Sequence, residues 1–104
     1  MIEGYSVQLG DRTLIVPPLT LKALRRLSPS IKNLASLREG VLPTDEQFGI
    51  ISEIVTAALN RNYPDLTQDS VEELLDTGNL HKILFAVMHA SGLEKNSKGE
   101  DPRP

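Results

Sequence analysis

The chain begins with two short segments that have the pattern of β-strands. Residues 5–9 alternate apolar and polar positions as a half-buried strand does, and residues 13–16 are rich in β-branched side chains. Gly10 lies between them, where a tight hairpin turn needs a residue that accepts a positive φ. The pattern predicts an N-terminal β-hairpin that ends at Pro17, because proline cannot donate to a strand ladder. A lone hairpin is marginally stable, so we expect one face to pack on helices or on a second copy.

Helical spacing of apolar residues replaces this alternation further along the chain. Thr20 is a suitable N-cap for a helix that begins at Leu21, where leucines then recur every three residues. Pro29 predicts an interruption of this helix, because the residue before a proline avoids the α-helical region. A short second helix is therefore expected over residues 30–38, with Gly40 as its C-terminal stop.

The clearest helical pattern in the chain begins after Thr44. Thr44 and Gln47 have the spacing of a capping box, and the two acidic residues between them suit the N-terminus of a helix. Apolar positions then mark one face over four turns, which we expect to be the spine of the core. This inward face carries Phe48, Ile51, Ile54, Val55, Ala58, Leu59 and Asn62.

Two more helices are predicted in the last third of the chain. Two caps compete for the first of them: Thr67 alone, or Ser70 with Glu73 as a capping box. The second helix is expected over residues 80–91, with Gly92 as its stop. The predicted fold class is α+β and mainly α, with the hairpin followed by about four to five helices.

The length and composition indicate one small folded unit and a polar tail. The chain has 104 residues, of which 39% are hydrophobic, enough for one aliphatic core. We expect a single domain over residues 1–93. Residues 94–104 contain no apolar side chain except proline, which predicts a disordered tail.

Several classes of site and location are disfavoured by the residues present. The chain has no cysteine, which excludes disulfides and thiol nucleophiles and favours a cytoplasmic setting. We find neither a signal-peptide pattern at the start nor an apolar run of the ~20 residues that span a membrane. His81 and His89 are eight residues apart, about 12 Å on a helix, too far for one metal ion. With no serine elbow or glycine-rich phosphate loop, we expect no enzyme activity and no cofactor.

The charged residues are unevenly distributed along the chain. Six basic residues lie between Arg12 and Arg38, whereas nine acidic residues and one basic residue lie between Glu39 and Asn79. These two segments could pair within the fold, between copies or with a partner, or could simply be solvated faces. The net charge of −3 and the lack of an aromatic platform argue against nucleic acid as the main partner.

Six residues are the candidates for protein binding. Phe85 lies off the apolar stripe of its helix, which makes it either an exposed contact anchor or part of a helix buried on two sides. The histidines four residues to either side of it are expected to face solvent. A basic patch on the first helix adds a second candidate contact. The candidates are Lys22, Arg25, Arg26, His81, Phe85 and His89.

Two segments resemble those of bacteriophage tail assembly chaperones. In that family a short hairpin precedes a stretch of the form PPL-T-L-x-x-L-R-R-L, and residues 17–27 have this form. Residues 63–67, 71–76, 79–80 and 86–93 are similar to the closing segment of the same proteins. The resemblance covers roughly residues 5–93 and rests on structural patterns, not on a catalytic signature.

The resemblance implies a protein that binds the tape measure protein of a long-tailed phage or prophage. Such chaperones keep this long helical client soluble and help recruit the tail tube protein around it. They act in the bacterial host cytoplasm, are absent from the mature virion and tend to self-associate. Two alternatives stay open: a small structural tail or connector protein that remains in the virion, and a small DNA-binding regulator that uses the basic patch.

Overall fold

The computed structural model describes residues 1–37 and 41–92. The elements along the chain are β1 (Tyr5–Leu9), β2 (Arg12–Val16), α1 (Leu21–Asn33), the 3-10 turn η1 (Leu34–Ser36), α2 (Asp45–Leu59), α3 (Gln68–Leu74) and α4 (Leu80–Ala90). The fold is α+β and mainly α, as the sequence predicts. The predicted stop at Gly40 and the predicted tail over 94–104 lie outside the described residues.

The predicted hairpin forms within one chain. β1 pairs antiparallel with β2, with Leu9 opposite Arg12, so only two residues make the turn. Gly10 has a φ of 66° and Asp11 does not have a positive φ, which matches a type II′ turn with glycine at its first central position. The apolar face of the hairpin packs into the core through Val7, Leu9, Leu14 and Val16.

The chain segment that follows α2 covers the outer edge of β2. The Ile15 N–H donates to the hydroxyl of Tyr63 at 2.9 Å, and the side-chain amide of Asn62 donates to the Ile15 carbonyl at 3.4 Å. Asn62 also receives the Ile2 N–H at 2.7 Å and donates to the Ile2 carbonyl at 2.8 Å. These bonds fix the hairpin and the start of the chain to the end of α2, and they satisfy backbone groups of a two-stranded sheet.

Helix α1 is continuous, so the predicted break at Pro29 is wrong. Thr20 caps the helix as expected, since its hydroxyl accepts the Ala23 N–H at 3.1 Å. Pro29 lies inside the helix on its exposed side. Because proline has no N–H, the backbone carbonyl one turn earlier has no helical partner, and on this side of the helix water can reach it. Buried Leu27 and Leu34 lie before and after the proline and hold both parts on the core. The expected second helix over residues 30–38 is wrong too, because residues 30–33 belong to α1 and the short turn η1 follows them.

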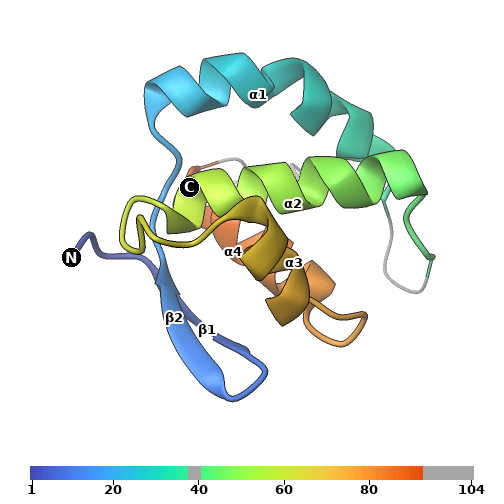
Figure 1. Cartoon of the computed structure of the whole chain (residues 1–104). Helices are drawn as coiled ribbons and strands as arrows, with labels where there is room; N and C mark the ends of the chain where they lie inside the picture. Colours follow the sequence, from blue (N-terminus) through green and yellow to red (C-terminus); the bar gives the residue numbers. More distant parts are fainter. Residues whose placement is uncertain (38–40, 93–104) are drawn as a thin grey trace, which may run out of the picture.

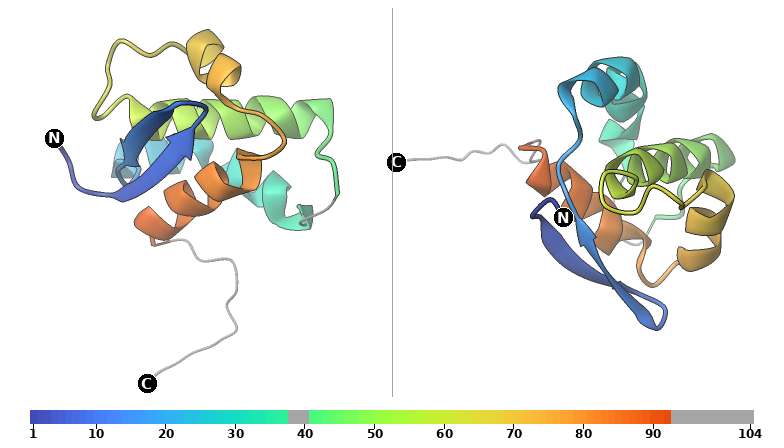
Figure 2. Two further views of the ribbon diagram at one scale, coloured as in Figure 1. Left: turned by 90° about the horizontal axis from the view of Figure 1, so that it is seen from below. Right: turned by 60° about the vertical axis from the view of Figure 1, so that its left-hand side comes forward.

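Helix α2 is the centre of the fold (Figure 1). The predicted capping box is confirmed: the Gln47 N–H donates to the Thr44 hydroxyl at 3.1 Å and the Thr44 N–H donates to Gln47 Oε1 at 3.0 Å. α1 crosses one side of α2, whereas α3, α4 and the hairpin lie on the other sides (Figures 1 and 2). On the predicted inward face, Phe48 and Asn62 are half-buried. The fully buried members are Ile51, Ile54, Val55, Ala58 and Leu59.

The last two helices have clear ends. Thr67 is the N-cap of α3 and forms a reciprocal box with Ser70, because each side chain accepts the backbone N–H of the other residue. This decides between the two caps that the sequence left open. α4 buries Leu80, Ile83, Ala86 and Val87, and Gly92 follows it with a φ of 77°, as a glycine stop requires.

Candidate protein-binding surface

One face of α4 presents the candidate residues of the last helix. His81, Phe85 and His89 follow one another at four-residue spacing, on the side away from buried Ile83 and Val87. Phe85 is 64% exposed, so its helix is not buried on two sides, and a role as a contact anchor stays a prediction. The expectation that both histidines face solvent is wrong, because both are half-buried. Phe85 of the same helix and Tyr5 of β1 lie against the imidazole of His89.

The rings of Tyr5, His89 and Phe85 form a continuous cluster, which we call the aromatic patch. The His89 ring lies 5.3 Å from the Phe85 ring at an interplanar angle of 14°, and 5.1 Å from the Tyr5 ring at 46°. These separations are typical of favourable ring pairs. Tyr5 is itself 44% exposed. The patch therefore joins the first strand to the last helix and presents two large side chains to water.

Tyr5 is a member of this patch that the sequence did not single out. Its odd position in β1 places it on the core-facing side with Val7 and Leu9, but at the open end of the strand. The alternation could have indicated that side. Only the packing of α4 across β1 shows that the tyrosine ring meets His89 and not the interior.

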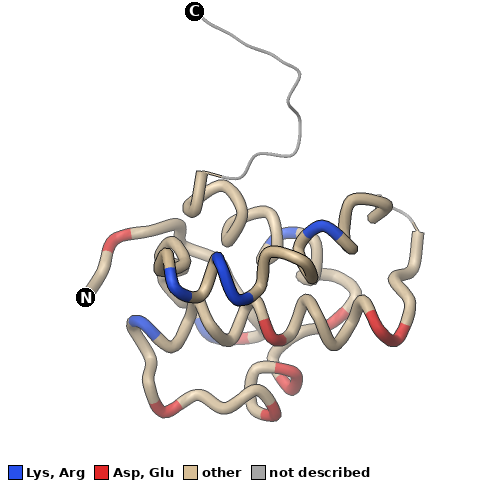
Figure 3. The backbone as a smooth tube through the Cα atoms, turned by 90° about the horizontal axis from the view of Figure 1, so that it is seen from above, with Lys and Arg blue, Asp and Glu red and all other residues tan. Residues whose placement is uncertain are grey.

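The basic patch on α1 is exposed, as expected for a solvated helix face. Figure 3 shows the basic positions of α1 together along this helix. Arg26 Nη1 lies 3.1 Å from Glu53 Oε2, the one ion pair between the basic and acidic segments among the residues described. Both side chains are about half exposed, so the pair contributes at most about 1 kcal/mol. Lys22 and Arg25 have no ion pair or hydrogen bond within residues 1–37 and 41–92. The six candidates thus divide between α1 and α4.

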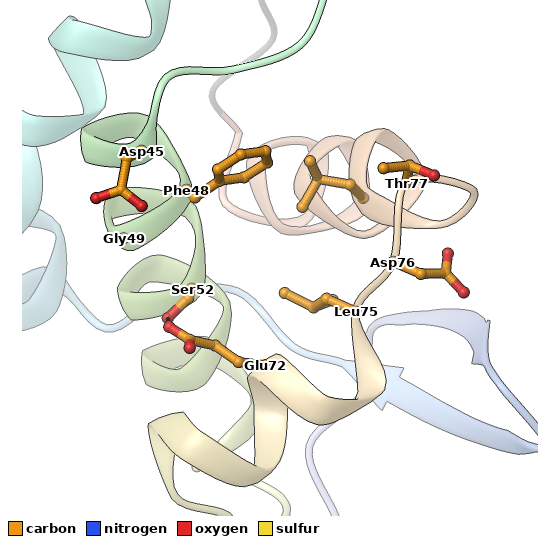
Figure 4. A pocket seen from close by; sticks show the side chains of 9 residues that line it. Asp45, Phe48, Gly49, Ser52, Glu72, Leu75, Asp76 and Thr77 are labelled. Atoms are coloured by element: carbon orange, nitrogen blue, oxygen red, sulfur yellow. Dashed lines mark hydrogen bonds between the residues drawn. The ribbon is translucent and has the colours of Figure 1, made fainter.

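A groove opens between α2 and α3 on another part of the surface (Figure 4). It has a volume of about 520 Å³, and its apolar wall is formed by Phe48, Leu75 and Leu80. Carboxyl groups lie around it as well, on Asp45, Glu72 and Asp76. We call this feature the acid-rimmed groove.

The acidic side chains of α3 and of the turn after it lie at the surface. Glu72 and Glu73 are exposed. Glu72 Oε2 accepts the hydroxyl of Ser52 at 2.7 Å, and the Gln68 amide donates to the same hydroxyl oxygen at 2.7 Å. Asp76 accepts backbone N–H groups of the turn that follows, at 2.8 and 2.9 Å. These bonds hold the rim of the groove in place.

Neither a metal-binding group of side chains nor a membrane-spanning helix is found among the residues that the structure describes. Residues 1–37 and 41–92 contain no group of three or more histidine, aspartate or glutamate side chains placed to hold a metal ion. None of the helices in these ranges combines the length and the apolar character needed to cross a bilayer. Comparison with protein-family models, with curated proteins and with solved structures finds no match for this chain. The surface features of the chain are therefore interpreted from the side chains that form them.

Proposed function

We propose that this chain is a bacteriophage tail assembly chaperone. In this role it binds the tape measure protein, keeps it soluble and helps recruit tail tube subunits during tail assembly in the host cytoplasm. The proposal rests on the resemblance of residues 17–27 and of segments within 63–93 to that family. It involves no catalysis, and the protein leaves before the virion is complete.

The observation that carries the protein-binding part of this proposal is the aromatic patch. Phe85 and Tyr5 expose large rings that a protein partner would remove from water. Exposed aromatic side chains with fixed neighbours are typical anchors of protein interfaces, because little side-chain entropy is lost when they bind. The stacked contact with His89 limits the motion of the Phe85 ring. The net charge of −3 helps such a protein stay soluble with apolar surface exposed.

Co-expression tests this function. The chain is produced together with each neighbouring gene product of its genome, and pull-down and soluble yield are measured. We expect one long helical protein, insoluble alone, to become soluble and to co-purify. If no neighbouring product binds, or if the chain is found as a stoichiometric component of purified particles, the chaperone proposal is wrong.

A pair of variants tests whether the client binds at the aromatic patch. Phe85→Ser removes the exposed ring, whereas Leu42→Ser removes a leucine that is 69% exposed elsewhere. We expect Phe85→Ser to lower the recovery of soluble client several-fold and Leu42→Ser to leave it unchanged. Leu42→Ser should keep the stability of the chain within about 0.5 kcal/mol, as surface changes do. Phe85→Ser should lower it by about 0.5–1.5 kcal/mol, because the stacked contact with His89 is lost. Equal recovery of soluble client with both variants would show that the client binds another face of the protein.

A further inference from the structure

We propose that the outer edge of β1 binds an extended segment of another protein, which adds to the hairpin as a third strand. In this segment every second side chain is apolar, and the side chains between them are polar. The proposal concerns the backbone groups of Ser6 and Gln8 and does not depend on the tape measure protein, so it goes beyond the chaperone function.

Part of the backbone of β1 points away from β2. In an antiparallel pair, residues that bond to the partner strand alternate with residues whose N–H and C=O groups face outward. Ile15 faces outward, because its N–H donates to Tyr63, and Ser6 lies opposite Ile15 in the register. Ser6 and Gln8 therefore turn their N–H and C=O groups to the outer side of β1. Both residues are exposed, and none of these backbone groups bonds to another described residue.

The structure covers part of the opposite edge of this sheet and leaves the edge of β1 open. On β2, the segment after α2 bonds to the backbone of Ile15 through Tyr63 and Asn62. β1 has a strand on one side alone, since the described residues form one two-stranded sheet (Figure 2). Exposed edges are commonly protected by a charged residue, a proline or a bulge, and β1 has none of these between Tyr5 and Leu9. Another strand can add to such an edge.

The open backbone groups specify an extended polypeptide chain as the partner. They recur at every second residue of β1, and a neighbouring strand repeats its own N–H and C=O groups at the same spacing. A helix uses these groups for its internal hydrogen bonds and cannot supply them. The edge of β1 therefore selects an extended segment and not a helical one.

The two faces of β1 determine which side chains suit the added strand. Val7 and Leu9 are buried on the inner face, where Tyr5 contacts His89 of α4, whereas Ser6 and Gln8 are exposed on the outer face. An added strand continues both faces, because its side chains alternate in the same way. Apolar side chains would extend the inner face, which includes Tyr5 of the aromatic patch, and polar side chains would face water.

A short alternating peptide tests the proposal directly. The probe is the capped peptide Lys-Thr-Val-Thr-Val-Thr-Val-Lys, which is added to the isotope-labelled chain while amide exchange is followed by NMR. We expect the Ser6 and Gln8 amides, which have no partner in the free chain, to exchange at least about tenfold more slowly when the peptide is bound. The amides of Val7 and Leu9 face β2 and should change less.

Methylated forms of the same peptide test whether its backbone makes the contact. Methyl groups on the threonine nitrogens block the donors that face β1 in an antiparallel pair, and methyl groups on the valine nitrogens block those that face it in a parallel pair. One form should bind at least about tenfold more weakly than the parent peptide, because it loses hydrogen bonds to β1, and the other should bind like the parent. Equal binding of the two forms would overturn the proposal.

Two proline variants test the edge from the side of the protein. Gln8→Pro removes an outward N–H from β1, and Thr13→Pro removes the outward N–H of its cross-strand partner on β2. Neither change removes a hydrogen bond between the strands, and urea unfolding checks that both variants fold. We expect Gln8→Pro to bind the parent peptide at least about fivefold more weakly, and Thr13→Pro to bind it like the wild type.

Three further results would overturn the proposal. The first is unchanged exchange of the Ser6 and Gln8 amides at millimolar peptide, and the second is an equal loss of binding in the two proline variants. The third is protection of these amides without peptide that increases with the concentration of the chain, which would identify a second copy as the occupant. Because no tape measure protein is present, these results are separate from the test of the chaperone function.

Discussion

The hydroxyl of Tyr63 accepts the backbone N–H of Ile15, 48 positions earlier in the chain. The Ile15 N–H points away from β1 and would have no partner in the hairpin itself, because it lies on the outer edge of β2. A partly buried donor without a partner lowers stability by about the cost of its desolvation. One phenolic oxygen therefore connects the end of α2 to the sheet.

We expect Tyr63→Phe to lower the free energy of unfolding by about 1–2 kcal/mol, because it leaves the Ile15 N–H without its acceptor. Urea unfolding followed by circular dichroism measures the change. Tyr5→Phe is the matched control, since the structure records no hydrogen bond of the Tyr5 hydroxyl, and its effect should stay within about 0.5 kcal/mol. Equal losses in the two variants would show that the Tyr63 hydroxyl does not stabilise the hairpin edge.

The sequence predicted only part of the aromatic patch. The spacing of Phe85 on α4 separated it from the apolar stripe, but it could not decide between exposure and a second buried face. That decision depends on whether another element covers this side of the helix. In the described structure β1 covers His89 through Tyr5, whereas Phe85 stays 64% exposed.

At the scale of elements, α1 shows how tertiary contacts outweigh a local rule. The residue before a proline avoids the helical conformation, and the proline removes one hydrogen bond. These local costs amount to a few kcal/mol. Burial of Leu27 and Leu34 on opposite sides of Pro29 offsets them, since each buried leucine contributes about 1.5–3 kcal/mol.

Pro29→Ala should therefore raise the free energy of unfolding, by about 1–2 kcal/mol. The alanine restores an N–H to the helix, and part of the gain is offset by the greater entropy of the unfolded chain. Thermal and urea unfolding measure the difference. Lys32→Ala, at an exposed position in the last turn of the same helix, is the comparison and should change little. A loss of stability in Pro29→Ala would mean that the packing of α1 needs the proline geometry.

At the scale of the whole molecule, α2 has the largest share of the packing. It contacts α1, α3, α4 and β2, and five of its apolar residues are fully buried. α3 has seven residues, of which only Val71 is buried. The free energy of local opening should therefore differ between these helices, because it follows the number of buried contacts that opening breaks.

Amide hydrogen exchange should show this difference. We expect the slowest exchange in the second half of α2, around Ile54 to Ala58, where protection should approach the global free energy of unfolding. The amides of α3 should exchange faster through local opening. Comparable protection in α2 and α3 would show that the described residues open as one cooperative unit.

The distribution of charged residues is also a property of the whole molecule. The sequence left open whether the basic and acidic segments pair within the fold. Among residues 1–37 and 41–92 one such pair forms, between Arg26 and Glu53. The other charged side chains of these two segments that the structure describes are exposed. Figure 3 shows the basic positions of α1 and the acidic positions of α3 on different parts of the backbone.

The sequence by itself determined the features that depend on near neighbours in the chain. The strands, the Gly10 turn, the cap at Thr20 and the capping box at Thr44 all follow from side chains within a few positions of the groups they satisfy. The tertiary structure decided the continuity of α1, the cover on the edge of β2, the exposure of Phe85 and the acid-rimmed groove. Each of these depends on which surfaces of distant elements meet, and a periodic pattern gives the apolar face of an element but not its partner.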